Sequence, residues 1–404
     1  MRSTKMLGLL ACFWIAGCIL AAQRTSLAQS PDWSQEVLPD FGQTRPEGMP
    51  RLLGSSNPAG VAFLRDGQLI VYAVEPTGRL SSRKSPELSS GFELRVTSLD
   101  VKSGKQILKR DWGTRRYDSA VQITSGGVLV KTGGIVKLYS RDFTEARDLP
   151  LTLDPNGSYF TSVSATGDTI AVSHYFEKEH HWISHIDVLD ASTLKTRFSW
   201  DQYPPIFDLL MSDEWFITKD PFHSIFYLTQ FGNTSQSKAI PIADALPQGC
   251  PLDISWAMIS DGSIALWGCK EVLLLNPNGA ALDSFADNSS AGPVSAQCGN
   301  YIPSMFNKWA MVASAAPIVA LSLPAKKVKN HLLTEPSVCL AGLQVAVYDL
   351  RRKQRVLTVD VDPLPKNGYD FALSPDGSKL AVLNGRRASV YSVPVPALNG
   401  GGAH

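Results

Sequence analysis

Histidine and carboxylate side chains gather in one short stretch of the chain, which is its densest group of chemically capable residues. The group consists of His174, Glu177, Glu179, His180, His181 and His185. Imidazole and carboxylate groups together suit zinc, copper or iron. Neighbouring residues in a strand point to opposite faces, however, so His180 and His181 do not share one side of a hairpin. We therefore predict a solvated hairpin tip without a stoichiometric metal, in which His174 and His185 meet across the two strands. The four histidines are only weak candidates for metal ligands.

Basic residues form the second group that could bind a ligand. Guanidinium pairs suit carboxylate or phosphate groups, with which they form bidentate hydrogen bonds. The candidates are Arg79, Arg115, Arg116, Lys326, Lys327, Arg386 and Arg387. If they share one surface, they predict a site for a small anionic ligand, a glycan or a protein. The alternative is a scattered, solvated set of charges.

Other chemical signatures are missing from the sequence. It contains no GxSxG elbow, phosphate-binding loop or HExxH motif, and we predict no cofactor. The formal net charge is +1, which gives no electrostatic footprint for nucleic acid. The aspartates of the tight turns are expected to hold those turns through side-chain hydrogen bonds; they are Asp66, Asp168, Asp213, Asp261 and Asp376.

A strand–turn–strand unit that recurs along the chain must position all these residues. Its clearest copy is FALSPDGSKLAVLNG, and seven copies begin at Val61, Ala120, Phe160, Phe207, Ile254, Ile302 and Phe371. Each copy is followed by a third strand, a polar turn and a fourth strand. Self-similarity at about 40–50 residues is typical of radial or stacked repeats. The pattern predicts an all-β, seven-bladed β-propeller of four-stranded antiparallel blades, in preference to a β-sandwich.

The two ends of the chain are expected to close the ring together. The last copy stops near Ser392 and lacks its fourth strand, and a closed ring leaves no open sheet edge. We expect the segment around Arg51-Leu52-Leu53 to supply the missing strand. The predicted divisions are 1–28 as an export signal, 29–50 as an N-terminal extension, 51–394 as the propeller and 395–404 as a tail.

Insertions collect on one face of the predicted ring. Loops that join the second strand of a blade to the third lie on the face that we call the top, and the DG-type turns lie on the other. Long top loops are expected in the first blade, in the third at EKEHH, and in the sixth from Ile318 to Leu340. Because variable loops often carry function, the top is the predicted functional face. The alternative is that these insertions have no function.

The first residues resemble an export signal. Arg2 and Lys5 precede an apolar run, and Ser26-Leu27-Ala28 offers a cleavage site before Gln29. Ile15-Ala16-Gly17-Cys18 is a rival, because it resembles a lipobox that would place a lipid anchor on Cys18. We favour soluble export to the periplasm or the medium, with the lipoprotein as the alternative.

Past the signal there are four cysteines, and an even number in an exported chain predicts disulfides. Cys250 lies in the connection into the fifth blade and Cys269 follows its second strand. Cys298 and Cys339 hold the same two places in the sixth blade. This register predicts the pairs Cys250–Cys269 and Cys298–Cys339.

The repeat Ser374-Pro375-Asp376-Gly377 through Leu380-Ala381-Val382 resembles those of the exported bacterial YVTN and quinoprotein-like propellers, a WD-repeat-like group. Two blade endings, at Trp112 and Trp200, also resemble the quinoprotein repeat. The resemblance implies a propeller on which many functions occur. The adjacent cysteine pair of quinoprotein alcohol dehydrogenases is absent. We expect an exported, non-catalytic binding or scaffold module of a bacterial cell envelope; the alternative is a propeller enzyme, either a lactonase-like hydrolase or an unusual quinoprotein.

Overall fold

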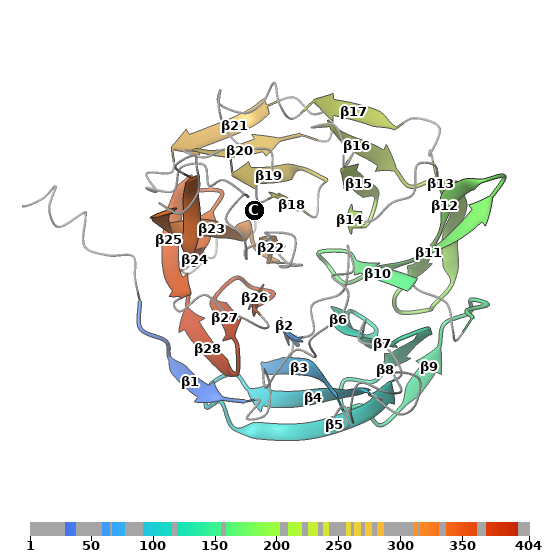
Figure 1. Cartoon of the computed structure of the whole chain (residues 1–404), viewed down its shortest axis with the longest axis horizontal. Coiled ribbons are helices and arrows are strands. Elements are labelled where there is room, and N and C mark those ends of the chain that lie inside the picture. The colour runs from blue at the N-terminus through green and yellow to red at the C-terminus, as the bar shows by residue number, and fades with distance from the viewer. Residues whose placement is uncertain are drawn as a thin grey trace, which may run out of the picture.

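The chain forms seven four-stranded antiparallel sheets arranged around a ring (Figure 1). The structure is a computed structural model. It describes residues 29–37, 59–64, 67–76, 92–114, 119–154, 159–202, 209–219, 225–232, 237–241, 256–259, 262–267, 271–276, 281–286, 310–313, 315–330, 337–361 and 369–394. The predicted seven-bladed propeller is therefore confirmed.

Within each blade the strands run from the centre outward in chain order, except that the outermost strand of the seventh blade is the first strand of the chain. The first three blades are β2 (Ala59–Phe63), β3 (Gln68–Pro76), β4 (Phe92–Asp100) and β5 (Gln106–Thr114); β6 (Ala120–Thr124), β7 (Gly127–Thr132), β8 (Ile135–Tyr139) and β9 (Ala146–Asp148); and β10 (Tyr159–Val163), β11 (Thr169–Lys178), β12 (His181–Asp190) and β13 (Thr196–Gln202). The next two are β14 (Leu209–Met211), β15 (Trp215–Lys219), β16 (Ile225–Gln230) and β17 (Lys238–Pro241); and β18 (Trp256–Met258), β19 (Ile264–Trp267), β20 (Glu271–Leu275) and β21 (Ala281–Ala286). The last two are β22 (Ala310–Val312), β23 (Ile318–Asn330), β24 (Ser337–Asp349) and β25 (Gln354–Val361); and β26 (Tyr369–Leu373), β27 (Lys379–Asn384) and β28 (Arg387–Ser392), completed by β1 (Trp33–Glu36).

The core is divided among the junctions between neighbouring blades. Each of the seven junctions holds one cluster of buried hydrophobic side chains. The second strands are the most deeply buried, as in β27, where Leu380 to Leu383 are all buried. Strands covered on both faces carry continuous apolar runs instead of alternating ones. This explains why the second strand of each repeat gave the clearest signal in the sequence.

The ring is closed by β1, not by the segment around Arg51-Leu52-Leu53, so that expectation was wrong. The four residues of β1 pair with Arg387–Val390 of β28. Trp33 donates its indole N–H to the Val101 carbonyl at 2.6 Å, and Gln35 donates its side-chain amide to the Gly104 carbonyl at 2.6 Å. These side chains fasten the closing strand to the first blade as well as the seventh. Arg51 to Leu53 lie outside the described residues.

In the sixth blade the strands lie later in the sequence than predicted. The repeat that begins at Ile302 predicts its second strand at WAMVAS, but this stretch contains β22, the first strand. The turn that follows reads Ala313-Ser314-Ala315-Ala316-Pro317 in the sequence, so it has neither the aspartate nor the glycine of turns such as Asp376-Gly377. Ile318 to Leu340 was predicted to be a loop, but most of it belongs to β23 and β24, two strands of 13 residues each.

Turns on the bottom face are fixed by their own hydrogen bonds. In five blades of the described chain, a backbone N–H after the third strand donates to a carbonyl of the turn after the first strand. The pairs are Val101 N–H to Gly67 O, Ala191 N–H to Asp168 O, Phe231 N–H to Glu214 O, Leu350 N–H to Pro317 O and Val393 N–H to Ser378 O. Asp376 accepts hydrogen bonds from Ser374 and Ser378 within its own turn, as predicted. Asp213 differs, because its carboxylate accepts the hydroxyls of Thr166 and Thr169 from the third blade. Asp66 and Asp261 lie outside the described residues.

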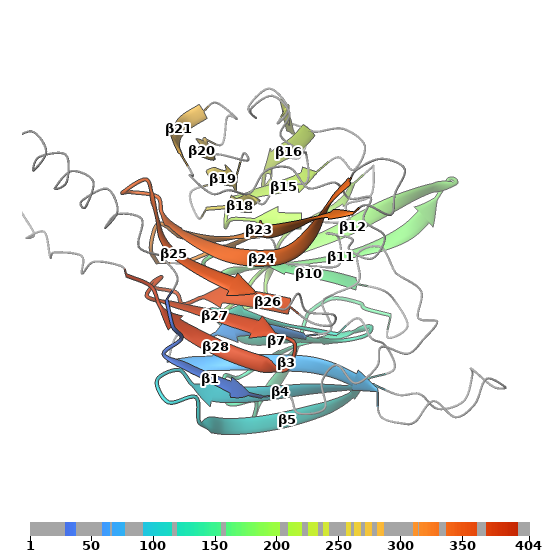
Figure 2. The same cartoon turned by 60° about the vertical axis from the view of Figure 1, so that its left-hand side comes forward.

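The turns between third and fourth strands use aspartate in the same way, which the sequence reasoning missed. Hydrogen bonds from Ser140 and Thr144 lower the pKa of Asp142 to about 2. Those from Thr193 and Ser192 lower the pKa of Asp190 to about 2. These carboxylates serve turn geometry, since their acceptor capacity is used locally. The bottom face therefore offers carboxylates that are already hydrogen-bonded, whereas long hairpins such as β11–β12 extend past their neighbours on the opposite face (Figure 2).

Candidate binding site

The structure places the predicted cationic residues unevenly. Arg79, Arg115 and Arg116 lie outside the described residues, the last two directly after β5 in sequence. Lys326 and Lys327 lie in β23, where their backbones pair with Gly342 and Leu340 of β24. The Lys-rich segment is thus part of a paired strand and not of a loop. Their convergence with the arginines stays a prediction.

Arg386 and Arg387 lie at the turn between β27 and β28, beside the end of the closing strand. The Arg386 guanidinium lies 3.7 Å from the Glu36 carboxylate, and the Arg386 carbonyl accepts the Val37 N–H at 3.0 Å. Arg387 is the backbone partner of Glu36 in the sheet. Part of the positive charge predicted for this edge of the top face is therefore offset by β1, a contact that the sequence reasoning did not anticipate.

The histidines of the third blade are arranged as predicted. His174 in β11 lies directly opposite His185 in β12, and their ring centroids are 5.2 Å apart. His180 lies at the hairpin tip with a fully solvated side chain. Glu179 and His180 adopt positive φ angles of 52° and 65°, as a two-residue hairpin turn requires. Burial and the neighbouring His185 lower the pKa of His174 below its ordinary value.

His185 is the centre of a hydrogen-bond network at the base of this hairpin. Its Nδ1 lies 2.7 Å from Asp201 Oδ1, and its Nε2 lies 3.1 Å from Ser199 Oγ and 3.5 Å from Asp187 Oδ2. Ser199 also donates to Asp187 Oδ1 at 2.8 Å. Every polar atom of the imidazole is thus engaged by residues of the same blade. In the described part of the chain, no group of three or more His, Cys, Asp or Glu side chains is arranged to hold a metal ion.

The predicted disulfides fall mostly on residues that are not described. Cys250, Cys269 and Cys298 lie outside the described residues. Cys339 lies in β24, where its backbone is opposite Val328 of β23. Cys339 therefore belongs to the third strand of its blade and not to the loop after the second. The pairs Cys250–Cys269 and Cys298–Cys339 stay predictions.

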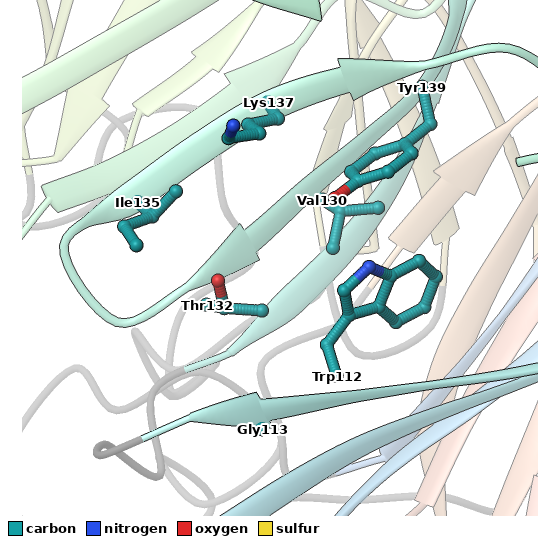
Figure 3. A pocket seen from close by; sticks show the side chains of 7 residues that line it. All are labelled: Trp112, Gly113, Val130, Thr132, Ile135, Lys137 and Tyr139. Atoms are coloured by element: carbon teal, nitrogen blue, oxygen red, sulfur yellow. The ribbon is translucent and has the colours of Figure 1, made fainter. Parts of the chain in front are cut away.

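A slot opens between the first and second blades, close to the top end of β5 (Figure 3). Its volume is about 210 Å³, and its walls come from β5, β7 and β8. The lining residues are Trp112, Gly113, Val130, Thr132, Ile135, Lys137 and Tyr139. β8 ends the hairpin that starts with β7, and the Gly133–Gly134 turn between them keeps this corner of the blade short. The strands β7 and β8 of the second blade are shorter than β3 and β4 of the first, and the slot lies where this short hairpin faces β5.

Aromatic packing sets the floor of the slot. Trp112 meets Tyr139 edge-on, with ring centroids 5.3 Å apart, and Phe143 at 5.6 Å. In Figure 3 the indole nitrogen of Trp112, the hydroxyls of Tyr139 and Thr132 and the ammonium of Lys137 surround the same opening. None of the first three polar groups forms a hydrogen bond with a described residue. Lys137 forms an ion pair with Asp148 at 3.1 Å, in which the Asp148 side chain is 79% exposed.

Sequence reasoning did not identify this slot. Trp112 was noted only as a repeat ending. The available signal was the combination of Trp112 with Tyr139: an aromatic residue near the end of an outer strand, followed in the next repeat by a second aromatic residue after a two-glycine hairpin. Such a combination indicates a corner where a bulky side chain faces a small turn.

Comparison with known proteins gives likenesses of shape only. No family model matches the chain, and no curated protein matches it. Among solved structures, the WD40 domain of Neurospora crassa Pan2 is 13% identical with a TM-score of 0.48, covering 84% of this chain and 90% of that one. Kluyveromyces lactis Hsv2p is 12% identical with a TM-score of 0.42, covering 81% and 89%. BamB from Moraxella catarrhalis is 12% identical with a TM-score of 0.34, covering 66% and 72%. At such scores these likenesses carry no argument about function.

Among the described residues, no helix has the length and the apolar character needed to span a lipid bilayer.

Proposed function

We propose that this chain is an exported, non-catalytic binding or scaffold propeller of a bacterial cell envelope, related to the YVTN-like group, whose top face takes an anionic partner. The observation that carries the proposal is the difference between the two faces. In the turns of the bottom face, the carboxylates of Asp142, Asp190 and Asp376 accept hydrogen bonds from residues of the same turn. The slot near the top end of β5, by contrast, holds donors that no described residue uses. A face with unused donors and cationic residues suits an acceptor-rich, negatively charged ligand.

Export is consistent with the position of the closing strand. The predicted cleavage between Ala28 and Gln29 would leave β1, which begins at Trp33, intact. Processing at Cys18 would instead leave a short spacer between a lipid and the ring. Either route keeps the residues that fasten β1 to Val101 and Gly104. Mass spectrometry of the N-terminal peptide, from protein recovered from the producing cells, distinguishes the two routes.

A propeller enzyme is the competing function, and the His185 network is the best place to seek one. Ser199, His185 and Asp201 form a serine–imidazole–carboxylate chain at 3.1 Å and 2.7 Å. Two features oppose hydrolysis. Asp187 accepts the Ser199 hydroxyl at 2.8 Å, and its charge would repel a developing oxyanion. The backbones of Ser199 and Asp201 are also paired within the sheet, opposite Asp187 and His185. Binding is therefore the function that this geometry favours.

Salt-dependent binding of anionic polymers tests the proposal. The wild-type protein should bind polyglutamate or a polyuronate more tightly at 20 mM than at 300 mM salt, because exposed charges are screened over about 10 Å at 0.1 M. Changing Arg115, Arg116, Arg386 and Arg387 together to Ala should weaken this binding and leave the circular dichroism spectrum unchanged. Unchanged affinity for every anion, with the fold intact, would contradict an anion-binding top face.

A further inference from the structure

Three hydrogen-bond donors in the slot between the first and second blades have no protein partner among the described residues. They are the indole N–H of Trp112 and the hydroxyls of Tyr139 and Thr132. Polar groups in protein interiors and clefts are usually paired with protein or water, and the large majority have at least one partner. The indole N–H of Trp33 follows this rule and meets a carbonyl at 2.6 Å, whereas the buried indole nitrogen of Trp200 is an exception. Unused donors that surround one opening indicate a ligand with several acceptors.

The size of the slot limits what enters it. Pockets that enclose drug-sized ligands or cofactors have volumes of roughly 300–1,000 Å³. A space of about 210 Å³ is smaller, so it admits one residue-sized group. A larger ligand would have to lie across the surface and insert a single side chain. This favours a polymer over a free metabolite.

The orientation of the rings selects the chemistry of the inserted group. Trp112 and Tyr139 pack edge to face with an interplanar angle of 64°, and Phe143 covers another part of Trp112. The indole nitrogen of Trp112 and the hydroxyl of Tyr139 lie on the side of their rings that borders the opening (Figure 3). Ring faces suit sugar rings and methylated cations, whereas N–H and O–H edges suit oxygen acceptors. A carboxylate supplies two acceptor oxygens and about four lone-pair sites, which matches the donors available.

Positive charge beside the slot completes the match. The Lys137 ammonium borders the opening, and its pairing with Asp148 is exposed and therefore worth little. Arg110 lies two residues before Trp112 in β5, so both side chains leave the same face of that strand. Arg110 is exposed and forms no ion pair with a described residue. Two cations, one on each of two strands that border the slot, suit an extended segment with more than one acidic residue.

We propose that the slot binds the carboxylate of a Glu or Asp side chain carried by an acidic segment of a protein partner. The inference rests on the anion-binding top face proposed above and adds the chemical class of the partner. In the complex, Trp112, Tyr139 and Thr132 donate to the carboxylate oxygens. Lys137 exchanges its contact with Asp148 for one with the ligand. Arg110 contacts a second acidic residue of the same segment.

Peptide binding measured by fluorescence anisotropy tests this assignment. The probes are labelled hexaglutamate and hexaglutamine, both acetylated and amidated so that side chains carry the only carboxylates. The wild-type protein should bind hexaglutamate and not hexaglutamine. Tyr139→Phe, Thr132→Val and Lys137→Met preserve size and should each weaken hexaglutamate binding about tenfold, since each removes a hydrogen bond to a charged group.

A matched control comes from the same strand as Trp112. Lys109 also pairs with an aspartate, Asp111 at 3.8 Å, but its side chain leaves the opposite face of β5. Lys109→Met removes the same charge and should leave the affinity within about twofold, within the range of a screened surface charge. If Lys109→Met weakens binding as much as Lys137→Met, the effect is one of net charge and the slot assignment fails.

The remaining outcomes separate the slot from the wider proposal. Loss of hexaglutamate binding in the Arg115, Arg116, Arg386 and Arg387 variant, without any effect of the slot variants, would overturn the slot and leave an anion-binding top face. No hexaglutamate binding by the wild-type protein would also overturn the slot. A polyuronate that binds tightly and depends on Tyr139, Thr132 and Lys137 would replace the acidic protein with an acidic glycan, and would refute the proposed partner.

Discussion

Two tryptophans on outer strands, Trp112 in β5 and Trp200 in β13, show how a small difference in position changes what a side chain can do. Each packs against aromatic residues of the next blade. Trp200 lies 5.1 Å from Phe216 and 6.4 Å from Phe231, and its indole nitrogen is buried without a partner. Trp112 packs against Tyr139 and Phe143 at similar distances, yet its indole nitrogen borders an open slot.

The difference follows from strand register. Gln106 in β5 and Thr196 in β13 hold equivalent places, since each pairs with the residue before the terminal aspartate of the third strand and each lies beside a bulge. Trp112 follows Gln106 by six residues, whereas Trp200 follows Thr196 by four. Trp112 therefore lies two residues nearer the top of its strand than Trp200 does. At that height the neighbouring blade offers Thr132 and Ile135 and not a phenylalanine stack. A tryptophan placed lower completes the core, whereas one placed higher presents its polar edge to solvent.

Truncating the two tryptophans should have the largest and most unequal effects on stability. Trp200→Ala should cost about 3–5 kcal/mol, the usual range when a large aromatic side chain is removed from a core. Trp112→Ala should cost roughly half as much, because one edge of the ring already faces the slot. Urea unfolding followed by fluorescence measures both. Equal losses would contradict the division into a core and a site.

Replacing a tryptophan by phenylalanine measures how much its indole N–H contributes to the free energy of unfolding. Trp33→Phe removes a hydrogen bond to Val101 and should cost about 1–2 kcal/mol, from the lost bond and the smaller ring. Trp200→Phe should cost less than Trp33→Phe, because removing a buried, unpaired N–H offsets part of the lost volume. The same unfolding assay ranks them. A larger loss at Trp200 than at Trp33 would mean that the Trp200 N–H is paired in solution.

Mildly acidic pH should lower the free energy of unfolding through His174 in the third blade. Burial and the neighbouring His185 lower the pKa of His174, so the folded state favours the neutral imidazole. The stability that this provides is complete above the ordinary pKa of 6.5 and is lost as the pH falls through the folded value. The carboxylates of Asp187 and Asp201, which face His185, raise the pKa of His174. They therefore oppose part of this loss of stability.

His174→Phe should therefore make the free energy of unfolding less dependent on pH below about 6.5. Denaturation curves at pH 7 and pH 5 for the two proteins provide the measurement. His181→Phe at the hairpin tip is the matched control, and it should keep the wild-type dependence. If both variants behave alike, His174 is not the group responsible.

Much of the ring could be predicted because its signals are local. A few consecutive residues are enough to recognise an apolar second strand, such as Leu380 to Leu383, or a tight turn, such as that of Asp376. The same reasoning predicted the meeting of His174 and His185, since both lie on one hairpin. It failed where the determinants are remote in sequence. Trp33 finds its partner at Val101, and the turn at Pro317 lacks the aspartate and glycine that would mark it.

The slot was missed for a related reason. Trp112, Thr132 and Tyr139 come from three strands of two blades, and no single stretch of sequence shows that their donors surround one opening. The cationic residues were found by type, but Arg386 is engaged by Glu36 of the closing strand, which lies far away in sequence. Residue types indicate available chemistry, whereas pairing decides which groups are still free to use it.

Removing the exposed counter-ion should produce the smallest effect. Asp148→Asn frees the Lys137 ammonium and removes a negative charge beside the slot. Because exposed ion pairs contribute about 0.2–1 kcal/mol, hexaglutamate affinity should rise by roughly two- to fivefold. Asp154→Asn, further along the same connection, serves as the control. A weaker affinity for Asp148→Asn would indicate that Asp148 orients Lys137 and does not compete for it.

The most direct measurement is the response of the tryptophan indole N–H signals to an acidic peptide, followed by ¹⁵N–¹H nuclear magnetic resonance. Trp→Phe variants assign the signals of Trp33, Trp112 and Trp200. In the free protein, the Trp112 indole proton should exchange rapidly with water, whereas those of Trp33 and Trp200 should be protected. On addition of hexaglutamate, the Trp112 signal should move and its exchange should slow, while the other two stay in place. A protected Trp112 signal in the free protein, or one that ignores the peptide while Trp33 or Trp200 responds, would contradict the account.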